Sequence, residues 1–327
     1  MSYAIFEQLC SRLKLGVIKK SPEPVSGGFT HKMYALVTST GKYAVKLLNP
    51  QIIQRKAASE KIQLAEKLEC ILDAHNIPII SAIQFQTKKL QEIDGHFFYV
   101  YPWYDGRILS FREIEMTHCS IIGKYLANIH SIERYDYPYR HTKLSVDWEP
   151  YIQKLSLQNP GLSLKLDEIC PFLYESQEKS NRAITNVPPV ITICHNDLDS
   201  KNVLWNGSDC KIIDLESMSY SSPFIELYKT ALRWSGYELC HIDYGLFGAL
   251  IKSYGDFGGS ITPDWESICN IDFGNLEWLE YNLKRSIGLN CTEDEKVLGT
   301  FVAKHTIDTL SYYYREKEHI LNCLQRI

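Results

Sequence analysis

The residue pattern of the chain changes at Pro102, and this change limits the folds open to it. Ahead of Pro102, runs rich in branched and aromatic residues predict short strands, at residues 33–39, 42–48, 80–86 and 96–104. Helical periodicity is found there only at residues 1–16 and 55–75. Beyond Pro102 helical patterns predominate, at residues 112–132, 222–238 and 276–288. Strands followed by helices, without regular alternation, predict an α+β fold.

The 327 residues are enough for two domains or lobes. We expect a small β-rich N-lobe at residues 1–103 and a larger, mostly helical C-lobe at residues 104–327, with a hinge near Tyr101–Asp105. Several prolines and helical fragments mark residues 133–188 as a helical insert in the C-lobe.

The composition excludes several classes of function. A net charge of −4 gives no basic surface for nucleic acid or for an anionic membrane. The ten cysteines stand singly, without the C-x-x-C spacing of zinc or thioredoxin-like sites, so we expect reduced thiols. No apolar run approaches the roughly 20 residues of a membrane span, and no signal peptide is recognisable. A soluble, cytoplasmic protein is expected.

The stretch CHNDLDSKNVLW, residues 194–205, carries the strongest motif. His195, Asp197 and Asn202 fit H-x-D-x-x-x-x-N, the spacing of the catalytic loop in protein kinases. Asn, Asp and Ser also dominate ordinary turns, so a surface turn is the alternative. Strand-like runs at 190–194 and 202–205 flank the motif, and a turn then leads to a third run, KIID at 211–214. This context favours a catalytic loop.

Asp214 ends that third run, where a kinase carries its second metal-binding aspartate. Carboxylate and amide oxygens suit Mg²⁺, which is held mainly through phosphate and few protein ligands. We therefore expect Asn202 and Asp214 to bind two Mg²⁺ ions. Asp197 would orient or accept the proton of the attacking hydroxyl, and His195 would order the loop.

The N-lobe supplies candidates for binding nucleotide. Lys46 lies in YAVKLL, which matches the V-A-I-K strand whose lysine contacts the α- and β-phosphates. Upstream, Gly27 and Gly28 form a turn through which backbone N–H groups can approach phosphate. Lys46 should pair with a helix carboxylate, for which Glu66 is preferred over Glu60. Tyr101, at the hinge, is a further nucleotide contact, and the nucleotide is ATP or GTP.

A literal D-F-G, residues 272–274, is a misleading match to the magnesium motif of kinases. It follows Asn202 by about seventy residues, with no hairpin between them, so Asp272 is expected to be an N-cap or a turn residue ahead of the next helix. Only about eight residues separate Asp214 from the next helix, and A-P-E is absent. The chain thus lacks a protein-kinase activation segment, which favours a small-molecule substrate.

Together these segments resemble the aminoglycoside phosphotransferases and choline kinase-like small-molecule kinases. The resemblance rests on SGGFTHKMYAL, YAVKLLNP, GKYLANIH, ICHNDLDSKNVLW and IIDLES. It implies a protein kinase-like bilobal fold with a helical, substrate-binding insert. Three positions depart from the family pattern: Asn196 replaces a frequent glycine, Asp199 a histidine, and Glu226 an aspartate.

Substrate contacts are less well defined by the sequence. The acidic and aromatic candidates for a cationic or sugar-like ligand are Asp199, Glu216, Trp234, Asp264, Glu277, Trp278, Glu280 and Tyr281. Glu277, Glu280 and Tyr281 share one helix face by their spacing. The alternative is a solvated helix that places Trp278 and Leu279 in the core.

The expected activity is transfer of the γ-phosphate of ATP or GTP to a hydroxyl of a small molecule, with an aminoglycoside-like antibiotic as the favoured acceptor. Choline, homoserine or a sugar are alternative acceptors. A catalytically silent nucleotide-binding module and a protein kinase are the alternative functions. No nucleic-acid or membrane partner is expected.

Overall fold

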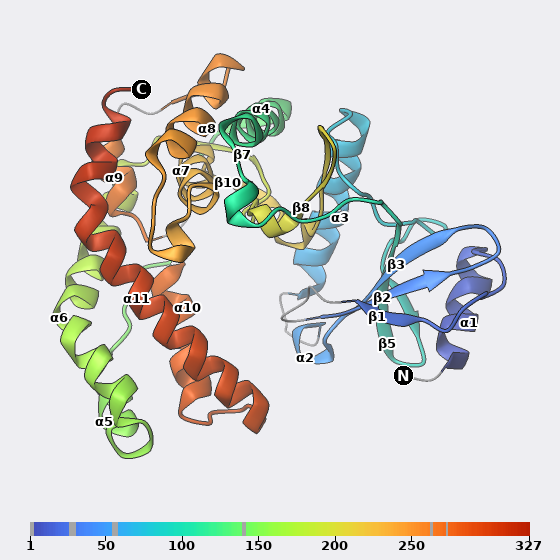
Figure 1. Cartoon of the computed structure of the whole chain (residues 1–327), viewed down its shortest axis with the longest axis horizontal. Helices are drawn as coiled ribbons and strands as arrows, with labels where there is room; N and C mark the ends of the chain where they lie inside the picture. The colour runs from blue at the N-terminus through green and yellow to red at the C-terminus, as the bar shows by residue number, and fades with distance from the viewer. Residues whose placement is uncertain (1–2, 26–30, 54–57, 139–141, 262–263, 273) are drawn as a thin grey trace. The chain divides into compact units, whose positions relative to one another are not determined.

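The computed structural model describes residues 3–25, 31–53, 58–138, 142–261, 264–272 and 274–327. Its contacts divide the chain into two compact units (Figure 1). Unit 1 comprises Met1–Ser110 and His195–Ser219, and unit 2 comprises Phe111–Cys194 and Tyr220–Ile327. The lobe boundary expected at residue 103 stays a prediction. By its contacts, the segment with the H-x-D motif is grouped with the first 110 residues.

Unit 1 is built on an antiparallel five-stranded sheet of order β1-β2-β3-β5-β4. The strands are β1 (Glu23–Val25), β2 (Lys32–Val37), β3 (Lys42–Leu47), β4 (Gln91–Ile93) and β5 (His96–Pro102). Helix α1 (Tyr3–Leu13) packs its apolar side, Phe6 and Leu9, into one core with Leu36, Val45 and Phe98 of the sheet. The strands predicted at 33–39, 42–48 and 96–104 are confirmed, as is the N-terminal helix.

The prediction of a strand at residues 80–86 is wrong. This segment makes isolated backbone bonds instead of a ladder: Ile80 N–H donates to Ile212 and Ile83 N–H donates to Val100. Its apolar residues Ile83 and Phe85 instead pack, partly buried, against the core of the sheet. The edge strand forms later, at β4, where polar residues concealed it from a search for apolar alternation.

The segment 195–219 joins unit 1 through a hairpin of β8 (Val203–Asn206) and β9 (Asp209–Ile212). Trp205 and Arg107 exchange backbone hydrogen bonds of 2.8 and 2.9 Å, and Ile212 N–H donates to the carbonyl of Pro78. Short helical turns, η3 (Ser200–Asn202) and η4 (Leu215–Ser217), flank the hairpin. Helices α2 (Pro50–Ile53) and α3 (Ala58–Ala74) complete the unit; the start predicted for α3, residue 55, lies outside the described residues.

Unit 2 is mostly helical (Figure 1). Its helices are η1 (Phe111–Glu113), α4 (Met116–Ile132), α5 (Glu149–Gln158), α6 (Pro160–Ala183), η2 (Ile184–Asn186), α7 (Pro223–Trp234), η5 (Tyr237–Leu239), α8 (Tyr244–Asp256), α9 (Trp265–Asn270), α10 (Asn275–Ser286) and α11 (Glu293–Leu324). A small sheet of order β10-β7-β6 joins β6 (Arg134–Asp136), β7 (Val190–Cys194) and β10 (Ser219–Ser221). The helices predicted at 112–132, 222–238 and 276–288 are thus present.

Close helix packing in unit 2 depends on glycine. Gly123 of α4 faces the backbone of α8, where an added Cβ would lie 2.3 Å from the carbonyl oxygen of Leu250. Helices α5 and α6, which form the predicted insert, pack against α10 and α11 around Trp148, Leu166, Leu279 and Ile307. The α+β class is confirmed: a small antiparallel sheet in one unit and a mainly helical remainder.

Across the part of the chain that the structure describes, no helix is both long enough and apolar enough to cross a membrane.

Candidate active site

The loop after β7 is ordered by His195, whose side chain is buried. The Asp197 N–H donates to His195 Nδ1 at 3.2 Å, so the neutral ring carries its proton on Nε2. That Nε2 donates to the carbonyl of Ile213 at 3.1 Å. The ring thus links the H-x-D loop to the residue before Asp214, which is the ordering role expected for it.

Asn196 adopts a left-handed backbone conformation, with φ of +64°. Glycine enters this region freely, and asparagine is among the few other residues that tolerate it. Its side-chain amide donates to Ser217 O at 2.9 Å and to Ser219 Oγ at 3.0 Å. Asn196 thus takes a backbone conformation that glycine enters freely, and its side chain makes two hydrogen bonds that glycine could not make.

Asp197 and Asn202 are joined directly. The Asn202 amide nitrogen donates to Asp197 Oδ2 at 2.9 Å and to the Asp197 carbonyl at 2.8 Å. The backbone of Asn202 is fixed in turn, because Ile213 N–H donates to its carbonyl at 2.9 Å. With its nitrogen turned toward Asp197, the amide of Asn202 presents its oxygen elsewhere, and oxygen is the donor that Mg²⁺ requires.

Asp214 is also held in the left-handed region, with φ of 63° and ψ of 56°. A non-glycine residue there is unusual, and such strain is often stored at functional sites. Its carboxylate accepts a 2.7 Å hydrogen bond from Lys46 Nζ. The Asp214 carboxylate and the Asn202 amide, on either side of the β8–β9 hairpin, offer oxygen atoms of the kind that Mg²⁺ binds, and the number of ions remains a prediction.

Lys46 has two carboxylate partners, and neither is the one expected. Its Nζ lies 2.7 Å from Asp214 Oδ1 and 2.6 Å from Glu216 Oε2. Burial would lower the pKa of Lys46, but the charges of both carboxylates outweigh it and raise the pKa. Burial would likewise raise the pKa of Glu216, yet His31 and Lys46 lower it to about 2.

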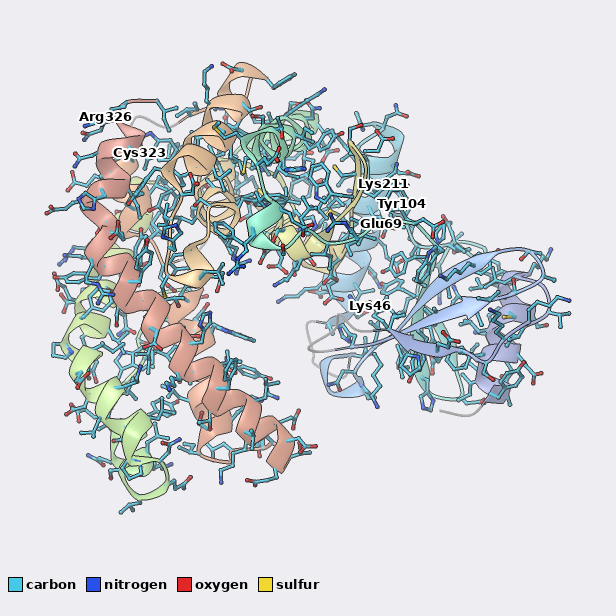
Figure 2. All side chains as sticks on the ribbon, in the orientation of Figure 1. Lys46, Glu69, Tyr104, Lys211, Cys323 and Arg326 are labelled. Carbon is cyan, nitrogen blue, oxygen red and sulfur yellow. The ribbon has the colours of Figure 1, made fainter. Side chains whose placement is uncertain are left out.

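The predicted pairing of Lys46 with Glu66 is wrong, because the Glu66 carboxylate binds other groups. Glu66 Oε1 accepts from the backbone N–H of Leu90 at 3.0 Å and from the Tyr99 hydroxyl at 2.9 Å. Glu69, one turn later on α3, pairs with Lys89 at 2.9 Å (Lys46 and Glu69 are labelled in Figure 2). The carboxylates Glu66 and Glu69 of α3 therefore bind groups of β5 and of the segment before it. The carboxylates that pair with Lys46 come from the chain after β9. The alternative partner, Glu60, is exposed on the first turn of α3.

The remaining N-lobe residues are partly described. Gly27 and Gly28 lie outside the described residues. Tyr101 of β5 pairs with Ala44 of β3, and its role at a nucleotide stays a proposal. Asp199 begins the η3 turn, and Lys201 Nζ lies 3.6 Å from its carboxylate and 3.8 Å from that of Asp197. Lys201 thus places a positive charge beside the Asp197 carboxylate.

Of the proposed substrate residues, several have other tasks. Glu216 bonds Lys46 as described above, and Trp234 is fully buried, so its ring lines no open site. Asp264 accepts from the N–H of Ser267 as the N-cap of α9. Glu216 of unit 1 and Trp234 and Asp264 of unit 2 thus have structural contacts, and a role for them at a substrate stays a prediction.

The face of α10 stays a candidate. Glu277 and Tyr281 are exposed, and Trp278, at 48% exposed, stacks on Tyr281 with ring centroids 5.6 Å apart. The alternative that buried Trp278 is therefore wrong, whereas Leu279 does lie in the core. Glu280 accepts from the Tyr151 hydroxyl at 2.8 Å.

Asp272 of the literal D-F-G lies in the turn before α10, whose N-cap is Gly274, and so meets the turn-residue alternative of the prediction. Its carboxylate accepts backbone N–H bonds from Gly274, Asn275 and Leu276 at the start of α10. Burial raises its pKa to about 6, although those N–H groups lower it. Asp272 belongs to unit 2, whereas Asp197, Asn202 and Asp214 share unit 1.

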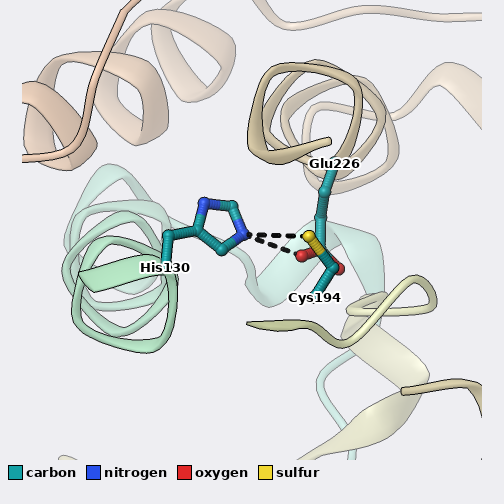
Figure 3. Close-up of side chains that lie close together, drawn as sticks. All are labelled: His130, Cys194 and Glu226. Carbon is teal, nitrogen blue, oxygen red and sulfur yellow. Dashed lines mark hydrogen bonds and ion pairs between the residues drawn. The ribbon is translucent and has the colours of Figure 1, made fainter. Parts of the chain in front are cut away.

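A second cluster in unit 2 joins His130, Cys194 and Glu226 (Figure 3). His130 Nε2 donates to Glu226 Oε2 at 2.8 Å and lies 3.7 Å from Cys194 Sγ. The Tyr254 hydroxyl lies 2.9 Å from Nδ1 of the same ring. Two ligands of one tetrahedral zinc ion stand roughly 3.3 Å apart, so a 2.8 Å contact is a hydrogen bond. The cluster fastens α4, β7 and α7, and Glu226 is the longer carboxylate in place of the family's aspartate.

Sequence reasoning missed His31, whose Nε2 lies 3.3 Å from Glu216 Oε1. No local pattern marks it, because the contact joins residues 185 positions apart. Lys201 was missed although it lies inside the quoted motif. Its spacing from Asp197, four residues, was the signal available.

Comparison with known proteins gives a consistent picture. The family model described as the phosphotransferase enzyme family matches residues 21–266. No curated protein sequence matches the chain.

Solved structures share the fold at low sequence identity. A spectinomycin phosphotransferase in complex with ADP and spectinomycin has a TM-score of 0.68 at 15% identity, covering 94% of this chain and 98% of its own. A microcompartment-associated aminopropanol kinase has a TM-score of 0.62 at 12% identity, with 97% and 98% covered. Choline kinase from Cryptosporidium parvum Iowa II has a TM-score of 0.57 at 15% identity, with 97% and 96% covered.

Proposed function

Since the chain belongs to the phosphotransferase enzyme family, we propose that it transfers the γ-phosphate of ATP or GTP to a hydroxyl group of a small molecule. The observation that carries this proposal is the arrangement of four groups in unit 1. Lys46 contacts Asp214 at 2.7 Å, and Asn202 contacts Asp197 at 2.9 Å, all on two neighbouring pieces of a rigid framework. Each of the four has a separate task in phosphoryl transfer.

Asp197 would orient the acceptor hydroxyl and take its proton. Its carboxylate is held by the Asn202 amide and lies 3.8 Å from the Lys201 ammonium. Lys46 would bind the phosphates of the nucleotide, and Asn202 with Asp214 would hold Mg²⁺. The metal would neutralise the charge that the phosphates carry and develop.

The favoured acceptor is an aminoglycoside-like antibiotic, and choline, homoserine and sugars are alternatives. Support comes from the structural likeness to a spectinomycin phosphotransferase and to choline and aminopropanol kinases. The exposed acidic and aromatic face of α10, with Glu277 and Tyr281, offers groups that attract a cationic ligand.

The test is a phosphorylation screen with ATP and with GTP against aminoglycosides, choline, ethanolamine, homoserine and sugars. Product formation with one acceptor, followed by mass spectrometry, identifies the substrate. Nucleotide binding without product for any acceptor favours a silent nucleotide-binding module. Labelling of a generic protein substrate instead would favour a protein kinase.

Matched variants then test the assigned residues. Asp197→Asn and Asp214→Asn should each lower turnover by about 10²–10⁴-fold, because proton transfer and charge neutralisation fail. Asp272→Asn makes the same chemical change at the literal D-F-G and should leave turnover within about twofold. Wild-type turnover in Asp197→Asn or Asp214→Asn, with circular dichroism unchanged, would refute the site.

A further inference from the structure

His31 lies between the glycine-rich residues and β2, and it is 8% exposed. The backbone N–H of Asn49 donates to His31 Nδ1 at 3.0 Å. Because Lys32 of β2 pairs with Leu47 of β3, Asn49 lies just beyond the end of the same ladder. The imidazole is therefore fixed by the sheet backbone.

That hydrogen bond also determines the tautomer. With Nδ1 acting as an acceptor, the neutral ring carries its proton on Nε2. This nitrogen lies 3.3 Å from Glu216 Oε1, so it can donate to the carboxylate without gaining a charge.

Glu216 uses its two oxygens separately. Oε1 faces His31 and Oε2 accepts from Lys46 Nζ at 2.6 Å. A carboxylate held at both oxygens cannot rotate freely, so the position of Oε2 depends on the contact at Oε1. The chain of contacts thus runs from the sheet backbone through His31 and Glu216 to Lys46.

Glu216 is also the partner that Lys46 can retain in the proposed reaction. Asp214 is needed as a metal ligand there, and Glu66 is occupied by Leu90 and Tyr99. We propose that His31 is a positioning residue that fixes the side chain of Glu216. Glu216, in place of a carboxylate on α3, then orients Lys46 toward nucleotide phosphates. This inference rests on the proposed nucleotide-binding function.

The test measures the affinity of the whole chain for ADP by isothermal titration calorimetry in the presence of excess Mg²⁺, the condition in which Asp214 would serve as a metal ligand and Glu216 would be the carboxylate left to Lys46. His31→Phe keeps a ring but removes both hydrogen bonds, and it should weaken ADP binding about tenfold, as expected for one lost bond to a charged group. His31→Gln offers one donor and one acceptor and should bind within about threefold of wild type.

A double-mutant cycle separates positioning from general support of the fold. Glu216→Ala should weaken ADP binding about tenfold, and His31→Phe added to it should weaken binding little further, because both changes break one chain of contacts. His75→Phe is the control and should bind like wild type; His75 is an exposed histidine after α3, and its Nδ1 lies 2.9 Å from the Ile71 carbonyl oxygen.

Four outcomes are decisive. Wild-type affinity in His31→Phe overturns the inference, and so do effects of His31→Phe and Glu216→Ala that multiply in the double variant. If the wild-type protein binds neither ADP nor ATP, the proposed function itself fails, which is a separate result. A fall in melting temperature without loss of affinity counts against the inference as well.

Discussion

Single residues show where local sequence is informative and where it is not. The spacing within CHNDLDSKNVLW brought Asp197 and Asn202 together, since five residues across one turn leave little choice of geometry. The partner of Lys46 could not be predicted from local spacing, because it depends on which of several carboxylates the fold brings near the lysine. Glu66 lies at a suitable helical position but is occupied by Leu90 and Tyr99.

A pair of substitutions tests this assignment. In Glu66→Gln the amide oxygen can still accept from Leu90 and Tyr99, so nucleotide kcat/KM should stay within about threefold, with stability lowered by about 1 kcal/mol. Glu216→Gln should lower kcat/KM by about tenfold or more, because Lys46 loses a charged partner. Steady-state kinetics with varied nucleotide decide it, and equal losses in the two variants would restore the helix carboxylate as the partner.

Asp272 predicts a dependence of stability on pH. Its pKa is raised to about 6 in the fold, above the roughly 3.9 of an unfolded chain, so the folded state binds the extra proton between these values. Its contribution to stability therefore falls as the pH rises from about 4 to 6. Asp272→Asn should lack this loss and gain about 3 kcal/mol relative to wild type between pH 4 and pH 7. Urea unfolding of both proteins across this range measures it; a constant difference would contradict it.

At the scale of elements, the sequence predicted most helices and strands but not how closely they pack. Periodicity marks which face of a helix is apolar, and α4, α7 and α10 formed where it was strong. The edge strand β4 escaped notice, and 80–86 was misassigned, because those segments are determined by neighbours distant in sequence. The glycine contact between α4 and α8 likewise left no local signal.

Two glycines test that contact. In an isolated helix, Gly→Ala is favourable by about 1 kcal/mol. Gly123→Ala should instead destabilise unit 2 by about 1–3 kcal/mol, because the new methyl group meets the backbone of α8 at Leu250. Gly248→Ala, whose Cβ would meet only Ile327 Cδ1 at 3.8 Å, should be neutral or stabilising by up to about 1 kcal/mol. Chemical denaturation measures both, and equal effects would contradict the close approach.

For the whole molecule, the main feature is that unit 1 is discontinuous in sequence. Its sheet comes from residues up to Ser110, and its hairpin β8–β9 comes from residues after Cys194. The hairpin covers backbone groups of Pro78 and Arg107 that would otherwise need water. The site residues fall in both pieces: Lys46 and His31 in the first, Asp197 and Asp214 in the second.

Fragments test this dependence. The chain 1–110 alone should be largely unfolded or aggregated, since it lacks the hairpin that pairs with it. Residues 1–110 joined to 195–219 by a flexible linker of about 20 residues, which reaches roughly 25 Å, should show cooperative thermal unfolding by circular dichroism. Equal melting temperatures for the two fragments would show that the hairpin contributes nothing.

Because unit 1 is discontinuous in sequence, it can be completed only after most of the chain has been synthesised. When Ser110 has been added, residues 111–219 must still be translated before unit 1 can close. At usual rates of about 5–20 residues per second, this takes roughly 5–20 s. During that interval Lys46 and His31 have been made but Asp197 and Asp214 have not, so a delay in translation between residues 111 and 219 would affect the yield of folded protein more than the same delay after residue 219.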